Sequence, residues 1–153
     1  MMDSINILIQ DRHLIQQAVA GLSARQMLAI PPGFDNNIAW NLGHIVVVQQ
    51  LLHYRLCGLD MAVSDQQIAM FKTGTSPADW PIEPDIASLP ALLSELPQKL
   101  LVDYQTGRFG DFTPFTTSTG IYLETLEEAI AFNNFHEGLH LGFILALRNI
   151  VVQ

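Results

Sequence analysis

Four stretches of the chain have the apolar spacing of helices, and residues that favour turns separate them. Leu, Ile, Val and Ala dominate the composition, while runs of strand-forming residues are few. The predicted helices cover approximately residues 4–22, 38–57, 88–104 and 123–150. Four helices with one short connection, and with long connections after the second and third helices, predict an all-α four-helix bundle.

Helix ends and breaks follow from particular residues. Pro31-Pro32-Gly33 breaks the chain, and Asp35-Asn36-Asn37 offers caps for the second helix, which Gly58 closes. Ser88 is a plausible cap of the third helix, in which Pro97 predicts a kink or a break. Two glycines in the fourth helix, Gly138 and Gly142, favour close packing against another helix.

The two long connections contain expected elements of their own. Residues 59–87 include a short helical turn at about Gln66–Phe71, and a connection of this length usually covers or borders a site. Residues 112–123 predict a hairpin that turns at Ser118-Thr119-Gly120.

The length of 153 residues predicts one domain, residues 1–153, with a core that needs neither a disulfide nor a metal to fold. Cys57 is the only cysteine, and we interpret it as a small core residue near a helix end. The first residues lack the features of a secretion signal, and no apolar run approaches the ~20 residues that span a bilayer. We therefore expect a cytoplasmic protein without a membrane role.

The net charge and the hydrophobic fraction of the chain indicate which kinds of partner it can bind. Seven Lys and Arg against fifteen Asp and Glu give a net charge of -8, which disfavours nucleic acid and anionic lipid as partners. Only 14% of the residues are charged and 49% are hydrophobic, so we expect apolar surface to be buried in a homodimer.

The histidines carry the functional prediction. His136 and His140 lie four residues apart, so both imidazoles lie on one face of the fourth helix, where they can chelate one ion. His44 shares an apolar stripe of the second helix and is the expected third ligand. His53 is rotated by ~180° from His44, and His13 is interpreted as a boundary residue, so both are expected outside the site. Three imidazoles leave coordination positions open, as in catalytic sites.

Residues 136–140 match the pattern H-E-x-x-H of zinc proteases, in which the glutamate activates zinc-bound water. That pattern is weakly specific, and no His, Asp or Glu follows His140 as a third ligand. Glu137 is thus a candidate catalytic proton acceptor, a candidate anchor for a ligand imidazole, or a residue of an ordinary helix surface pair.

Several short motifs occur in an order that resembles the DinB-like superfamily of bacterial four-helix-bundle metalloproteins. They are Asn41-Leu42-Gly43-His44-Ile45, Phe71-Lys72-Thr73-Gly74, Thr125-Leu126, the segment from His136 to Gly142, and Leu147-Arg148. The resemblance covers most of the chain. Phe143 departs from it, because relatives often have Gln at this position.

The resemblance implies a His triad of His44, His136 and His140 that binds nickel, zinc or a similar divalent ion, often in a homodimer. Some relatives are thiol-dependent transferases or isomerases, and many have no known activity. We therefore expect a metal-dependent transferase that joins a low-molecular-weight thiol to a small electrophile, because a metal lowers the pKa of a thiol. Two alternatives stay open, a non-catalytic metal-binding or stress-related protein and a metal-dependent hydrolase.

Overall fold

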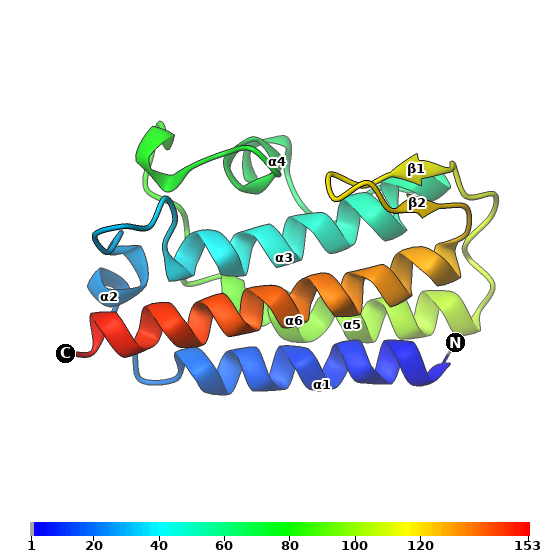
Figure 1. The fold of residues 1–153 in the computed structure, drawn as a ribbon. Helices are drawn as coiled ribbons and strands as arrows, with labels where there is room; N and C mark the ends of the chain where they lie inside the picture. Colours follow the sequence, from blue (N-terminus) through cyan, green and yellow to red (C-terminus); the bar gives the residue numbers. More distant parts are fainter. Residues whose placement is uncertain (1) are drawn as a thin grey trace.

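A computed structural model describes residues 2–153 (Figure 1). Helices dominate this part of the chain, with one small antiparallel sheet, which confirms the predicted all-α class. The elements are α1 (Met2–Val19), α2 (Ala24–Leu28), α3 (Ile38–His53), the 3-10 helix η1 (Arg55–Cys57), α4 (Asp65–Phe71), the 3-10 helix η2 (Pro77–Asp79), α5 (Leu89–Gln105), β1 (Phe115–Thr116), β2 (Tyr122–Leu123) and α6 (Leu126–Val151).

The four long helices form the bundle. α1 packs against α5 and α6, and α3 packs against the same two helices. α1 and α6 run in one direction and α3 and α5 run in the other (Figure 1). The chain therefore needs a long crossover between the parallel neighbours α3 and α5, and α4 and η2 lie in that crossover.

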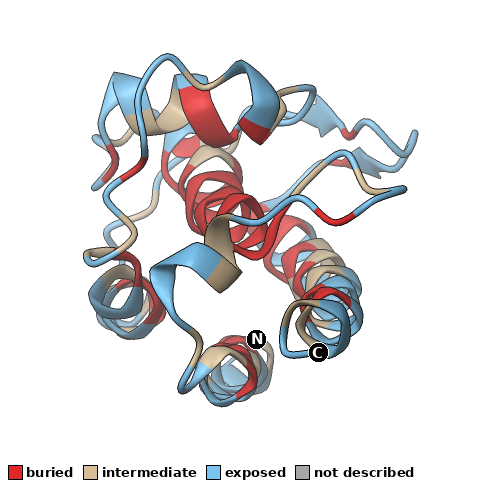
Figure 2. Ribbon diagram, turned by 90° about the vertical axis from the view of Figure 1, so that its left-hand side faces the viewer, coloured by how far each residue is buried: buried red, intermediate tan, exposed pale blue. Residues whose placement is uncertain are grey.

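α3 is the central helix. Every residue from Asn37 to Gln50 is buried, and in the end-on view the buried colour runs round this helix (Figure 2). Its buried polar side chains include Asn41, His44, Gln49 and His53. Because buried polar groups need partners, this helix is where polar contacts across the bundle concentrate.

Local residues explain the helix ends. Asn37 Oδ1 accepts a hydrogen bond from the backbone N–H of Trp40 at 2.7 Å, and Gly58 ends the α3–η1 segment with φ 68°. α2 was not predicted, although Ser23 and Gln26 form a capping box at its start. A kink or a break was expected at Pro97, and α5 continues through this residue without a break.

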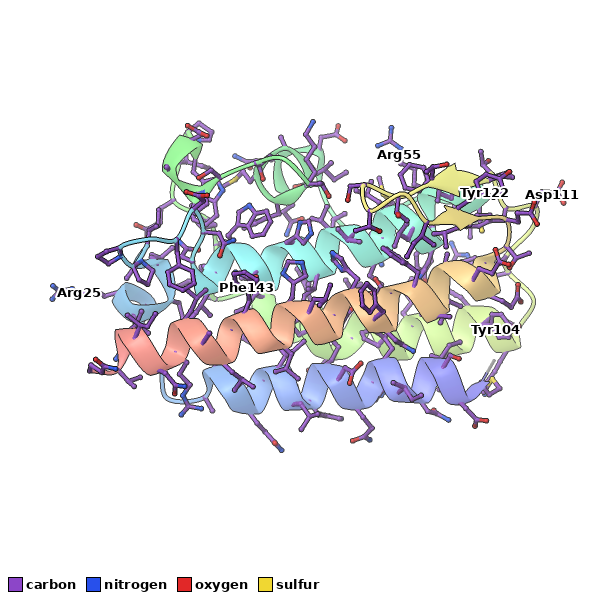
Figure 3. All side chains as sticks on the ribbon, viewed as in Figure 1. Arg25, Arg55, Tyr104, Asp111, Tyr122 and Phe143 are labelled. Carbon is purple, nitrogen blue, oxygen red and sulfur yellow. The ribbon has the colours of Figure 1, made fainter. Side chains whose placement is uncertain are left out.

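The elements of the two long connections lie near the predicted positions. α4 covers the predicted turn and packs on α3. The hairpin pairs Phe115 with Leu123 and Thr116 with Tyr122, and Gly120 turns it with φ 83°. Figure 3 labels Tyr122 on this hairpin, over one end of the bundle.

The outer face of α6 is apolar. Within α6, the only charged residue between Glu128 and Arg148 is Glu137, and its side chain is buried. A Cβ added at Gly138 or Gly142 would meet nothing within 4 Å, so the close packing expected at these glycines does not occur within the chain. The large exposed apolar side chains of α6 are Phe135, Leu139, Phe143, Leu145 and Ile150.

Within residues 2–153, no helix is both long and apolar enough to cross a membrane.

Candidate metal centre

Three imidazole rings converge between α3 and α6. Nε2 of His136 lies 3.1 Å from Nε2 of His44 and 3.2 Å from Nε2 of His140. One ring nitrogen of each histidine lies within 4.8 Å of the others, so the three side chains could hold a metal ion. These are the three histidines that were predicted from the sequence as metal ligands. His44 is buried, while His136 and His140 are partly exposed.

The orientation of His44 is determined by two contacts. Its Nδ1 lies 2.7 Å from the carbonyl oxygen of Phe71, at the end of α4. Because a carbonyl can only accept, Nδ1 carries the proton and Nε2 presents a lone pair to the other histidines. The ring of Trp40 stacks on that of His44, with centroids 4.5 Å apart and planes 14° from parallel.

His140 is oriented in the same way by a side chain. Its Nδ1 lies 2.7 Å from Oδ1 of Asn41. The orientation of the Asn41 amide is defined independently, since its Nδ2 donates to Oδ1 of Asn36 and to the carbonyl of Asn37. Oδ1 of Asn41 therefore accepts from Nδ1–H of His140, which leaves Nε2 of His140 unprotonated and directed at His136.

His136 completes the cluster, and within residues 2–153 it has no hydrogen-bond partner beyond the other two histidines. Its Nδ1 is buried and makes no hydrogen bond. One proton on Nε2 of His136 can point at only one of the two neighbouring Nε2 atoms, so the lone pair of the other has no donor. A cation at the convergence point satisfies all three nitrogens, and zinc–nitrogen bonds of about 2.0–2.1 Å are compatible with nitrogens this close together. The donor set thus fits a divalent metal ion.

The environment keeps these imidazoles neutral. Burial, together with the neighbouring imidazole of His44, lowers the pKa of His136 to about 3. Burial and the other two imidazoles lower the pKa of His140 to about 3, and burial also lowers the pKa of His44. Because metal binding requires the neutral imidazole, protons compete weakly for this site at neutral pH.

A buried ion pair lies beside the triad. The guanidinium of Arg12 in α1 contacts both carboxylate oxygens of Glu137, with Nη2 donating to Oε1 at 2.7 Å. Nη2 also donates to the carbonyl of Ile45, and Asn133 donates to the same glutamate. Gln49 donates to the carbonyl of Leu96 in α5, so one polar network links all four long helices.

Glu137 is 0% exposed, so the interpretation as an ordinary helix surface residue is wrong. Its recorded hydrogen bonds go to Arg12 and Asn133 and not to a histidine of the triad. The buried stripe of α6 contains Asn133, Glu137 and Ile144, whereas the two histidines lie at its edge. Their edge position lets them reach α3 while staying partly exposed.

The remaining histidines and the cysteine lie outside the cluster. Among residues 2–153 only the three predicted histidines group as potential metal ligands, so His13 and His53 lie outside this cluster. His53 is fully buried, and neither of its ring nitrogens makes a hydrogen bond of ordinary geometry. Cys57 is buried at the end of η1, as expected, and burial raises the pKa of its thiol.

Aromatic rings flank the triad along α6. The ring of Phe132 lies 6.1 Å from that of His136, with the planes 27° from parallel. Phe143 lies on the side of α6 that faces α3 and makes an edge contact with Phe34 at 6.5 Å (Figure 3). At this position, where relatives often have Gln, the chain has a half-exposed aromatic ring.

Sequence reasoning did not single out Arg12 as a residue of the site. A signal was present, since Arg12 continues the buried stripe of Ile5, Leu8 and Ile15. Glu137 occupies the equivalent place in the stripe of α6. Opposite charges within two apolar stripes predict a buried ion pair between the helices.

Fold and site together define a helical-bundle protein with a candidate three-histidine metal centre. The family model described as the DinB superfamily matches residues 7–144. The chain therefore belongs to the DinB superfamily, as the motifs of its second and last long helices predict. A search of curated proteins finds no significant match.

Proposed function

We propose that this protein binds one divalent metal ion through His44, His136 and His140. The observation that carries the proposal is the convergence of the three Nε2 atoms, two of which are left unprotonated by acceptors on the far side of their rings. Three neutral imidazoles suit nickel or zinc, the two ions we expect. They also leave coordination positions for a small molecule.

We further propose that the bound ion serves a transferase that joins a low-molecular-weight thiol to a small electrophile. A bound divalent ion lowers the pKa of a coordinated thiol and holds the thiolate in place. The chain itself supplies a partly exposed approach past His136 and His140 and apolar walls from Phe132 and Phe143. Such walls suit an electrophile with an apolar body.

Glu137 is proposed as a positioning residue rather than a proton acceptor. Both of its carboxylate oxygens are engaged by Arg12, which disfavours a role in activating water. Because Glu137 follows His136 and Arg12 also binds the carbonyl of Ile45, which follows His44, the network holds the two ligand-bearing helices beside the site. This geometry favours the transferase over a hydrolase that depends on Glu137.

We propose a homodimer in which the apolar face of α6 is buried. Phe135, Leu139 and Leu145 are each about half exposed on a face without charged side chains. Leu145→Glu should shift the sedimentation coefficient from that of a dimer to that of a monomer while zinc binding is retained. A wild-type protein that sediments as a monomer at micromolar concentration would contradict the dimer.

The activity is tested by incubating metal-loaded protein with glutathione, bacillithiol or mycothiol and an aryl chloride such as chlorodinitrobenzene. The sulfur–carbon bond forms, the carbon–chlorine bond breaks, chloride leaves with the bonding pair, and the thiol proton goes to solvent. A saturable rate with one thiol, lost in His140→Ala, supports the transferase. Metal binding without turnover for any thiol would instead support the non-catalytic metal-binding protein.

A further inference from the structure

We propose that Gly43 is a positioning residue for the metal centre. Its lack of a side chain lets the ring of Phe71 pack directly on α3, which places the Phe71 carbonyl against Nδ1 of His44. This inference rests on the proposed metal site. In it, the short helix α4 orients one of the metal ligands, His44.

The contact at Gly43 leaves no room for a larger residue. A Cβ added there would lie 2.4 Å from Cδ1 of Phe71 and 2.5 Å from its Cγ and Cε1. These distances are well inside van der Waals contact, so an added methyl group must displace the ring. Phe71 is 3% exposed, so its ring has little free space into which it can move.

Neighbouring residues hold the end of α4 in this place. The ring of Trp80 packs edge-on against that of Phe71 at 5.4 Å, and its Nε1 donates to the carbonyl of Met70 at 3.0 Å. The hydroxyl of Thr75 lies 2.9 Å from the same carbonyl and accepts from Nε1 of Trp40 at 3.0 Å. A displaced Phe71 ring therefore cannot leave without moving the backbone at residues 70–71.

The Phe71 carbonyl is available to His44 because α4 ends at this residue. The last carbonyls of a helix have no N–H partner within it, and a side chain can take that place. Nδ1 of His44 takes that place and lies 2.7 Å from the Phe71 carbonyl oxygen, while Trp40 stacks on the face of the imidazole ring. Trp40 defines the plane of the imidazole, and Phe71 defines which nitrogen carries the proton.

Docking of α4 and coordination by His44 are linked as a consequence. A change that displaces the Phe71 carbonyl removes the acceptor that keeps Nε2 of His44 unprotonated and pointed at the site. By linkage, an ion bound at the triad stabilises the docked position of α4 by the same free energy. Acceptors behind ligand histidines typically change metal affinity by about 10–100-fold when removed.

The test compares two alanine substitutions of helical glycines. Gly43→Ala should weaken zinc binding at least about tenfold in a titration against a competing chelator. Gly142→Ala is the matched control, because a Cβ there meets nothing within 4 Å, and its zinc affinity should equal that of the wild type. Equal zinc affinity in Gly43→Ala and the wild type would overturn the proposal.

A double variant separates the contact from a general loss of stability. Gly43→Ala combined with Phe71→Ala carries the same methyl group without the ring it would strike, so zinc affinity should recover relative to Gly43→Ala alone. This comparison holds even if Gly43→Ala alone fails to fold, since the double variant should then regain both the fold and zinc binding. A double variant no better than the single one would contradict the proposed contact.

The metal-free protein provides a readout that does not depend on zinc. Long-range proton–nitrogen NMR spectra should show His44 with its proton on Nδ1 in the wild type and should show this signature lost in Gly43→Ala. If the wild type binds no zinc, the proposed metal site fails, and the spectra still decide the role of Gly43. The same His44 tautomer in both proteins would overturn the inference.

Discussion

At the scale of single residues, hydrogen bonds behind the histidines determine what the site can bind. A neutral histidine whose Nδ1 donates to an acceptor-only atom must present an unprotonated Nε2, and His44 and His140 both meet this condition. The acceptors are a backbone carbonyl and an amide oxygen, so neither adds a negative charge. The triad is therefore a neutral donor set, and a bound divalent ion keeps its full positive charge for a ligand.

Replacing Asn41 should weaken metal binding without removing a ligand. Asn41→Leu deletes the acceptor of His140 Nδ1–H, and we expect zinc affinity to fall about 10–100-fold in a chelator competition. Asn36→Ala, which removes only one partner of the Asn41 amide, should cost less. An unchanged affinity in Asn41→Leu would mean that the amide does not orient His140.

His53 should make the fold sensitive to acid. Burial lowers its pKa to about 3, against 6.5 in the unfolded chain, so the unfolded chain alone binds the proton between these values. The free energy of unfolding is therefore unaffected by His53 above about pH 6.5 and falls as the pH is lowered towards 3. Between those limits, one such group contributes a slope of about 1.4 kcal/mol per pH unit.

The measurement is urea unfolding of the metal-free protein at pH 7, 5.5 and 4.5. As the pH falls, the free energy of unfolding should decrease less steeply in His53→Leu than in the wild type. The difference in slope should correspond to about one proton. The matched control is His13→Leu, which replaces an exposed histidine. Parallel curves for the wild type and His53→Leu would show that His53 is not kept neutral by the fold.

At the scale of elements, the long helices followed from the sequence because their periodicity and caps are local properties. The start of α3 at Asn37 and the end of the α3–η1 segment at Gly58 illustrate this, as does the turn of the hairpin at Gly120. Pairings between elements did not follow, because a helix buried on all sides, such as α3, has no distinctive face. The triad was found because two of its members share one helix face, whereas the Phe71 carbonyl is a backbone atom that no residue pattern identifies.

The ion pair between α1 and α6 should be costly to break from one side. Arg12→Met leaves the carboxylate of Glu137 buried without its partner, so the free energy of unfolding should fall by about 3–5 kcal/mol. Arg12→Met combined with Glu137→Leu removes both charges and should recover most of that loss. Urea unfolding of the two variants checks this, and a loss below about 1 kcal/mol in Arg12→Met would show that water reaches the pair.

At the scale of the whole molecule, the core does not depend on the site. Clusters of buried apolar residues extend along the bundle on both sides of the triad, and they include Ile38, Ile45 and Ile144 in one cluster and Ile5, Leu100 and Ile130 in another. A core of this extent is enough to stabilise a chain of 153 residues. The candidate metal centre thus lies within a bundle whose core does not need a metal ion to form.

Removing the metal should therefore leave the helices folded. After treatment with a chelator, the helical circular dichroism should stay near that of the metal-loaded protein, and only the thermal midpoint should fall, because a ligand that binds the folded state alone stabilises it. Unfolding on chelation, as zinc fingers show, would identify a structural ion and would remove the main support of the transferase proposal.

The most direct test of the histidine triad is the zinc stoichiometry of protein purified without a metal-affinity tag, measured by titration for the wild type and for single histidine variants. The wild type and His13→Ala should each bind one ion per chain. His44→Ala, His136→Ala and His140→Ala should each lose that binding while their circular dichroism stays near wild type, because two imidazoles hold an ion poorly against water and buffer. Undiminished zinc binding in any of these three variants would contradict the assignment of the triad.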